Sequence, residues 1–226
     1  MTLQYVEILF QVIAFLFAIS VHESAHAWMA NRRGDPTARM LGRITLNPIK
    51  HIDPIGTVLL PLIALFAHIP MLGWAKPTPV NPRNFANPVL DDILTSVVGP
   101  VSNFVVAAGA TIVLLAIKLT SPAGQMVIEG LTRGRLIHSE SLMVPLCVLF
   151  HVLVEINVLL AVFNLLPVPP LDGSHVVRHL LPDPMRRVYD MMGFAGLMLL
   201  VYFGGGLLNA LLSPVLSAFD WILLNA

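Results

Sequence analysis

Long apolar runs separated by short polar stretches make up most of this sequence. A membrane-spanning helix needs about 20 predominantly apolar residues. Five runs have roughly that length, at residues 3–29, 92–119, 144–166, 188–204 and 206–224. The pattern therefore predicts an all-α, multi-pass membrane protein with about five transmembrane helices.

Two further segments do not fit a spanning helix. Residues 54–69 are apolar, but the segment is short and has Pro61 at its centre, which favours a re-entrant element over a span. Between Ala38 and Asn47, Met40, Gly42, Ile44 and Leu46 alternate with Leu41, Arg43, Thr45 and Asn47. This weak period of two predicts a short strand or hairpin.

Composition agrees with a membrane protein. Hydrophobic residues make up 56% of the 226 residues and charged residues 12%, against about 45–50% and about 25% in soluble domains. We expect one membrane-embedded domain over residues 1–226, with a core at about 3–180 and C-terminal helices at about 185–226. No Lys or Arg precedes the first apolar run, so we expect a retained helix rather than a signal peptide. The formal net charge of zero argues against a nucleic-acid partner.

The first apolar run contains the pentapeptide His22-Glu23-Ser24-Ala25-His26. On a helix, histidines at i and i+4 share one face, so their ring nitrogens can bind one Zn²⁺. A glutamate beside them can take a proton from a zinc-bound water and later give it to the leaving amine. Ionisable residues inside an apolar helix are costly and indicate a functional site.

A catalytic zinc usually has three protein ligands, so a third is needed. The candidates are Asp172, Glu155, and the pair His175 and His179. His22 and His26 are near the end of their helix, whereas Glu155 lies roughly 16 Å deeper at 1.5 Å per residue. Asp172 follows a proline-broken helix end and has the right depth if that helix ends on the same face as the first one.

The basic residues indicate whether these helix ends share a face. If residues 54–69 are re-entrant, ten basic residues lie on the shared face and three on the other, whereas a spanning segment gives eight and five. The positive-inside rule favours the re-entrant arrangement and makes the shared face cytoplasmic. The ten residues are Arg32, Arg33, Arg39, Arg43, Lys50, Lys76, Arg83, Arg178, Arg186 and Arg187.

Three motifs resemble the site-2 protease family of intramembrane metalloproteases (peptidase family M50). They are the HExxH sequence at 22–26, Gly99-Pro100-Val101-Ser102-Asn103, and the stretch from Asn164 to Gly173 that ends in Leu171-Asp172-Gly173. The chain is similar to the small type without PDZ or CBS domains. The resemblance implies one Zn²⁺ per chain, held by His22, His26 and Asp172, with Glu23 as the catalytic base.

The resemblance also suggests roles for other residues. Asn164 would help to hold the scissile peptide or its oxyanion, although it could instead cap its helix. Asn103 fits better as a polar residue of helix packing than as a catalytic one. Residues 38–47 resemble the family's membrane-associated strand region, where a substrate could be held by strand addition. We expect His151 and Glu155 to pair with each other or with another polar group of the bundle.

The resulting hypothesis is an intramembrane zinc endopeptidase that cuts peptide bonds in or near transmembrane segments of membrane-protein substrates. We expect a bacterial or archaeal cell membrane, with the lipid bilayer and a transmembrane substrate as partners. The oligomeric state is not predicted. A non-proteolytic metal-binding membrane protein or transporter, and a hydrolase of lipids or small amides, remain as alternatives.

Overall fold

The computed structural model describes residues 2–59, 74–135 and 141–226. The chain divides into two compact units, one formed by Met1–Ala18 and Pro100–Ala226 and the other by Ile19–Gly99. The boundaries fall inside helices α1 (Thr2–Arg32) and α4 (Pro88–Thr120). The first is the helical unit and the second the motif unit.

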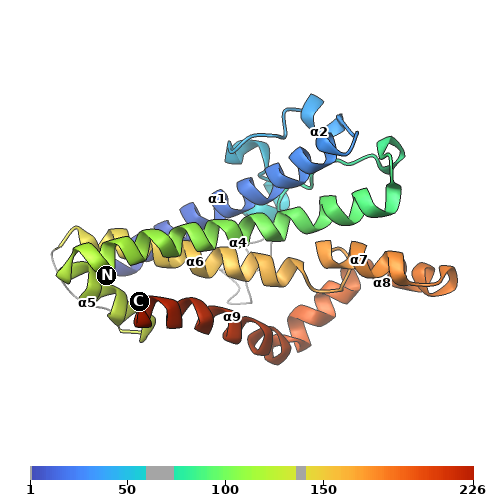
Figure 1. Cartoon of the computed structure of the whole chain (residues 1–226). Coiled ribbons are helices and arrows are strands. Elements are labelled where there is room, and N and C mark those ends of the chain that lie inside the picture. The colour runs from blue at the N-terminus through green and yellow to red at the C-terminus, as the bar shows by residue number, and fades with distance from the viewer. Residues whose placement is uncertain (1, 60–73, 136–140) are drawn as a thin grey trace. The chain divides into compact units, whose positions relative to one another are not determined.

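The helical unit has its core between α4, α5 (Pro122–Thr132), α6 (Met143–Asn164) and α9 (Gly205–Asn225). Figure 1 shows α5, α6 and α9 packed against one another. Small or branched side chains such as Ala107, Ala110 and Val158 are buried there, which lets the helices approach closely. Two helices, α7 (Asp172–Leu180) and α8 (Asp183–Phe203), connect α6 to α9.

Four helices of the described residues are long and apolar enough to cross a membrane: Ile8–Arg32, Pro88–Thr120, Met143–Asn164 and Gly205–Asn225. This confirms the all-α, multi-pass prediction. The expected span at 188–204 is helical but belongs to α8, which begins with several charged residues and is interrupted at Gly193, where φ is 40°. Those charges explain why α8 is not among the four.

Polar residues of the helical unit pair with one another, as expected. The Asn103 amide donates to the Ala18 carbonyl at 3.2 Å and to the Asn157 side chain at 2.8 Å, and both asparagines are fully buried. His151 lies 3.7 Å from Glu155 and 3.8 Å from Asp220. These contacts confirm the packing role of Asn103 and the pairing of His151 with Glu155.

The motif unit surrounds the end of α1 and the beginning of α4. Between them lie α2 (Thr37–Met40), the 3-10 turns η1 (Pro48–Lys50) and η3 (Pro82–Asn84), and the π-turn η2 (Pro54–Leu59). Residues 74–81 have no helical or strand hydrogen-bond pattern. The expected re-entrant segment 54–69 begins at η2, and most of it lies outside the described residues.

The buried Asp35 carboxylate ties these pieces together immediately after α1. It accepts hydrogen bonds from the Thr37 amide (3.1 Å) and hydroxyl, the Asn81 amide (2.7 Å) and the Asn84 side chain (2.7 Å). Burial alone would raise the pKa of Asp35, but these hydrogen bonds outweigh burial and lower the pKa. Asp35 therefore stays ionised and fixes the chain on both sides of the undescribed segment.

The strand predicted for residues 38–47 is wrong. Ala38–Met40 belong to α2, the following residues form turns, and Gly42 has φ 66°. Arg43 is only 5% exposed, whereas Met40 and Leu46, from the other set of the alternation, are 80% and 57% exposed. The loop instead encloses the polar side chain of Arg43 and presents apolar side chains on its outside, as suits a protein in contact with lipid.

Candidate metal centre

His22, Glu23 and His26 lie in the last third of α1, within the motif unit. The two histidine side chains are nearly buried, at 7% and 8% exposure, and the Glu23 side chain is 12% exposed. As the spacing predicts, the histidine rings share one helix face, with their centroids 4.6 Å apart. The spacing therefore placed these three side chains together correctly, and their chemical roles remain predictions.

A backbone carbonyl of α4 orients the His26 ring. His26 Nδ1 lies 2.6 Å from the Thr95 carbonyl oxygen. A carbonyl can only accept, so Nδ1 carries the proton and Nε2 keeps its lone pair. Metal-binding histidines are commonly oriented by a second hydrogen bond of this kind.

The two Nε2 atoms face each other at 3.0 Å. Nitrogens bound at 2.0–2.1 Å to one tetrahedral zinc would be about 3.3 Å apart. Only a few tenths of an ångström separate the two arrangements, so these imidazoles fit a Zn²⁺ ion. Two imidazoles within an apolar helix are also a donor set that suits zinc.

Gly99 leaves the space that the two rings occupy. A Cβ atom built on Gly99 would lie 2.6 Å from His26 Cε1 and 2.8 Å from His22 Cε1, and closer still to His26 Nε2. Contacts this short do not occur in proteins. The glycine of the Gly-Pro motif therefore allows α4 to pack directly against the histidine pair, a role that the sequence had not suggested.

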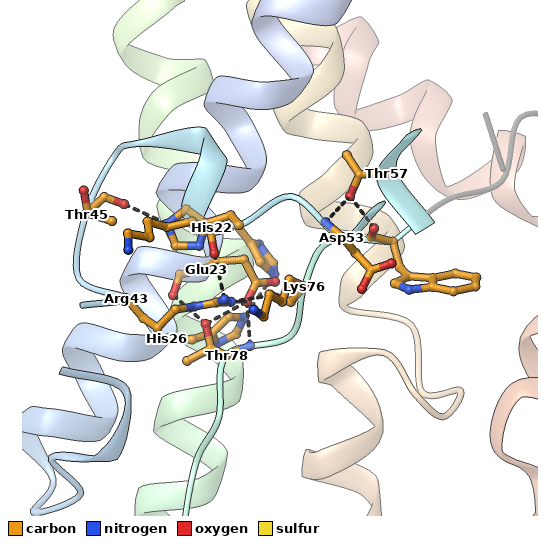
Figure 2. A network of polar contacts seen from close by, with 12 residues as sticks. His22, Glu23, His26, Arg43, Thr45, Asp53, Thr57, Lys76 and Thr78 are labelled. Atoms are coloured by element: carbon orange, nitrogen blue, oxygen red, sulfur yellow. Dashed lines mark hydrogen bonds and ion pairs between the residues drawn. The ribbon is translucent and has the colours of Figure 1, made fainter. Parts of the chain in front are cut away.

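Glu23 is held by the segment 74–80, as Figure 2 shows. The Thr78 backbone N–H donates to Glu23 Oε2 at 2.9 Å and the Thr78 hydroxyl lies 2.7 Å from the same oxygen. Arg43 Nη2 is 4.0 Å from Oε2. Sequence reasoning missed Thr78 and Arg43, because no spacing rule links residues so far apart.

The other predicted residues belong to the helical unit. Asp172 is the first residue of α7 and is partly buried, directly after the turn that follows α6. Asn164 is the last residue of α6, and its amide donates to the Leu160 carbonyl one turn earlier at 3.0 Å. That hydrogen bond is the helix-end interaction considered as an alternative, so a role for Asn164 in catalysis stays a prediction.

Comparison with known proteins identifies relatives over most of the chain. The model of peptidase family M50 matches residues 10–203. A Bacillus subtilis (strain 168) protein named "Putative zinc metalloprotease YwhC" is 37% identical over 208 residues, which cover 92% of this chain and 85% of the relative. Proteins named "Putative zinc metalloprotease Rip2" are 29% identical in Mycolicibacterium smegmatis (82% of this chain, 63% of the relative) and 28% identical in Mycobacterium tuberculosis strain H37Rv (92% and 71%). No solved structure matches.

Apolar spanning helices, one of which carries paired imidazoles beside a held carboxylate, define an integral membrane protein with a metalloprotease motif. The chain belongs to peptidase family M50, the site-2 protease family. It is thus a membrane zinc metalloprotease, a hydrolase of the site-2 protease type.

Proposed function

We propose that this chain is an intramembrane endopeptidase that cleaves peptide bonds within or beside transmembrane segments of membrane-protein substrates. The observation that carries the proposal is the pair of Nε2 atoms facing each other at 3.0 Å inside an apolar helix, with Glu23 directly after His22 in that helix. The names of the relatives describe zinc metalloproteases, and a protease site in an apolar helix is accessible first to substrates in the same bilayer.

One Zn²⁺ would be held by His22, His26 and Asp172. A carboxylate completes a donor set of two imidazoles that zinc uses in hydrolases. Asp172 begins a helix after a turn with three prolines, Pro167, Pro169 and Pro170, and the sequence around it resembles the family's motif. When bound, the ion would polarise the scissile carbonyl and lower the pKa of water to about 7.

Glu23 would act as the general base and then as the general acid. Its carboxylate would take the proton of the attacking water and deliver it to the leaving amine. Asn164 would donate a hydrogen bond to the scissile peptide through the second N–H of its side-chain amide, since the other already reaches the Leu160 carbonyl. A substrate helix hides its carbonyls in hydrogen bonds, so it must unwind locally before cleavage.

The test compares variants of the purified full chain in zinc content and in cleavage of a model transmembrane substrate. Glu23→Gln should keep zinc and lose cleavage, and Asp172→Ala should lose both. Glu155→Ala is the matched control, because it removes a carboxylate that was the competing candidate ligand. Wild-type cleavage by Glu23→Gln would refute the mechanism, and unchanged zinc in Asp172→Ala would refute the ligand set.

The orientation is a second part of the proposal. Ten of the 13 basic residues lie on the face with the metal site if residues 54–69 are re-entrant, so that face would be cytoplasmic, in the cell membrane of a bacterium or archaeon. Because Cys147 is the only cysteine and is buried, introduced cysteines can report sidedness. Lys50→Cys should react with a membrane-impermeant thiol reagent only from the cytoplasm, and Arg133→Cys only from outside. The opposite result would invert the topology.

A further inference from the structure

Within the described residues, the hydrogen bonds and the ion pair of the Glu23 carboxylate all involve one of its two oxygens. The Thr78 N–H and hydroxyl both reach Oε2, and Arg43 Nη2 lies 4.0 Å from the same oxygen. Within the part of the chain that the structure describes, Oε1 has no hydrogen bond or ion pair. The carboxylate is therefore held by one oxygen and keeps the other as an open acceptor (Figure 2).

Arg43 joins the two loops that form this contact. Its Nη1 donates to the Lys50 carbonyl at 2.7 Å, and its Nη2 donates to the Lys76 carbonyl. The Lys76 N–H in turn donates to the His51 carbonyl at 2.8 Å. Arg43 thus fixes the segment that carries Thr78, in addition to placing a positive charge near Glu23.

The charge of Arg43 persists despite its burial. Burial lowers the pKa of this guanidinium, and the neighbouring Glu23 opposes that effect. An arginine remains protonated in proteins because its pKa is above about 12. The ionised form of Glu23, which a base requires, therefore faces two donors and a permanent cation.

We propose that Thr78 and Arg43 are positioning residues for the general base: they anchor Oε2 so that Oε1 is presented to the proton it must accept. This rests on the proposed function of Glu23. A general base works only within about 2.6–3.2 Å of its proton, and a misplacement of about 1 Å can cost roughly a hundredfold in rate. A glutamate with three side-chain torsions would otherwise adopt several rotamers, of which few direct an oxygen correctly.

Thr78→Val is the decisive variant. It keeps the side-chain shape and the backbone N–H but removes the hydroxyl. We expect zinc content and KM to stay at wild-type values, and kcat for a model transmembrane substrate to fall by about tenfold to a hundredfold. Thr78→Ser restores the hydroxyl and should recover most of kcat.

Thr57→Val is the matched control. The Thr57 hydroxyl donates to the Trp74 carbonyl at 2.7 Å, so this variant loosens the same segment without touching Glu23. We expect near wild-type kcat. For Arg43, Lys should retain more activity than Gln, because Lys keeps the charge near Oε2.

Three results would overturn the proposal: wild-type kcat in Thr78→Val, no recovery in Thr78→Ser, or an equal loss of kcat in Thr57→Val. Glu23→Gln is measured beside them, so that failure of the general-base role of Glu23 can be distinguished from failure of the positioning role of Thr78 and Arg43. If Glu23→Gln cleaves normally, the proposed function of Glu23 fails. If Glu23→Gln is inactive while Thr78→Val is fully active, only the positioning role fails.

Discussion

Replacement of Gly99 by alanine tests whether close packing of α4 shapes the histidine pair. The added Cβ would lie 2.6 Å from His26 Cε1 and closer still to His26 Nε2, and an ordinary van der Waals contact starts at 3.4 Å, so the ring must retreat by at least about 0.8 Å. Metal–ligand distances tolerate only about 0.2 Å. The required movement is at least roughly four times larger than this tolerance, and the Cβ would also lie 2.8 Å from His22 Cε1.

We therefore expect Gly99→Ala to lower zinc affinity by at least about a hundredfold, comparable to the larger losses seen when a ligand's supporting contact is removed. Overpacking should also cost about 1–3 kcal/mol of stability. The assay is metal content per chain after purification, followed by zinc titration with a competing chelator. Helix content by circular dichroism checks that the protein is folded.

Gly109→Ala is the control for Gly99→Ala. Gly109 lies in the same helix, and a Cβ there meets nothing within 4 Å. It should bind zinc like the wild type and should be slightly more helical, since alanine favours a helix over glycine. Stoichiometric zinc with unchanged affinity in Gly99→Ala would refute the reasoning, because it would show that α4 can move away from the rings at no cost.

Two further predictions concern other close contacts. Gly173→Ala would place a Cβ 2.5 Å from the Leu165 carbonyl carbon, so it should displace the start of α7 and reduce zinc content. Gly205→Ala is the control, because a Cβ there meets nothing within 4 Å, and it should keep its zinc. Equal zinc content in the two variants would contradict this prediction. The pKa of Asp35 is lowered in the folded protein, so the ionised carboxylate stabilises the fold. This stabilisation is fully present above the pKa of the unfolded chain, about 4, and is lost as the pH falls through the lower pKa of the folded protein. Asp35→Asn should increase backbone hydrogen exchange at residues 81–84 at pH 7, and exchange in this variant should no longer respond to titration of residue 35 below pH 4. Exchange like that of the wild type at both pH values would contradict the role of the Asp35 hydrogen bonds in holding residues 81–84.

Local sequence patterns predicted the parts of the protein that depend on helix periodicity. The i, i+4 spacing of His22 and His26 determines a shared face regardless of the tertiary fold, and four of the five apolar runs correspond to helices long and apolar enough to span a membrane. The strand prediction for residues 38–47 failed because an alternation of apolar and polar residues does not determine which side chains are buried. In a membrane protein the outside is also apolar, so the buried position belongs to Arg43.

The support of Glu23 could not be derived from the sequence for a different reason. Thr78 reaches Glu23 through a loop whose path depends on the contacts of Arg43 with two carbonyls. Such contacts leave no periodic signal. Gly99 was visible in the sequence as part of a Gly-Pro motif. The reason why this position must lack a side chain becomes clear only from the packing of α4 against His26.

The prolines of the segment that holds Glu23 have a consequence for aggregation. Trp74, Lys76 and Thr78 already donate their N–H groups to Gly56, His51 and Glu23, and Pro77 and Pro79 have none to offer. An exposed extended edge normally invites pairing by any passing strand, and proline blocks such pairing. The segment is therefore protected from forming a sheet with an unfolded chain. Such pairing, which would pull Thr78 away from Glu23, is disfavoured.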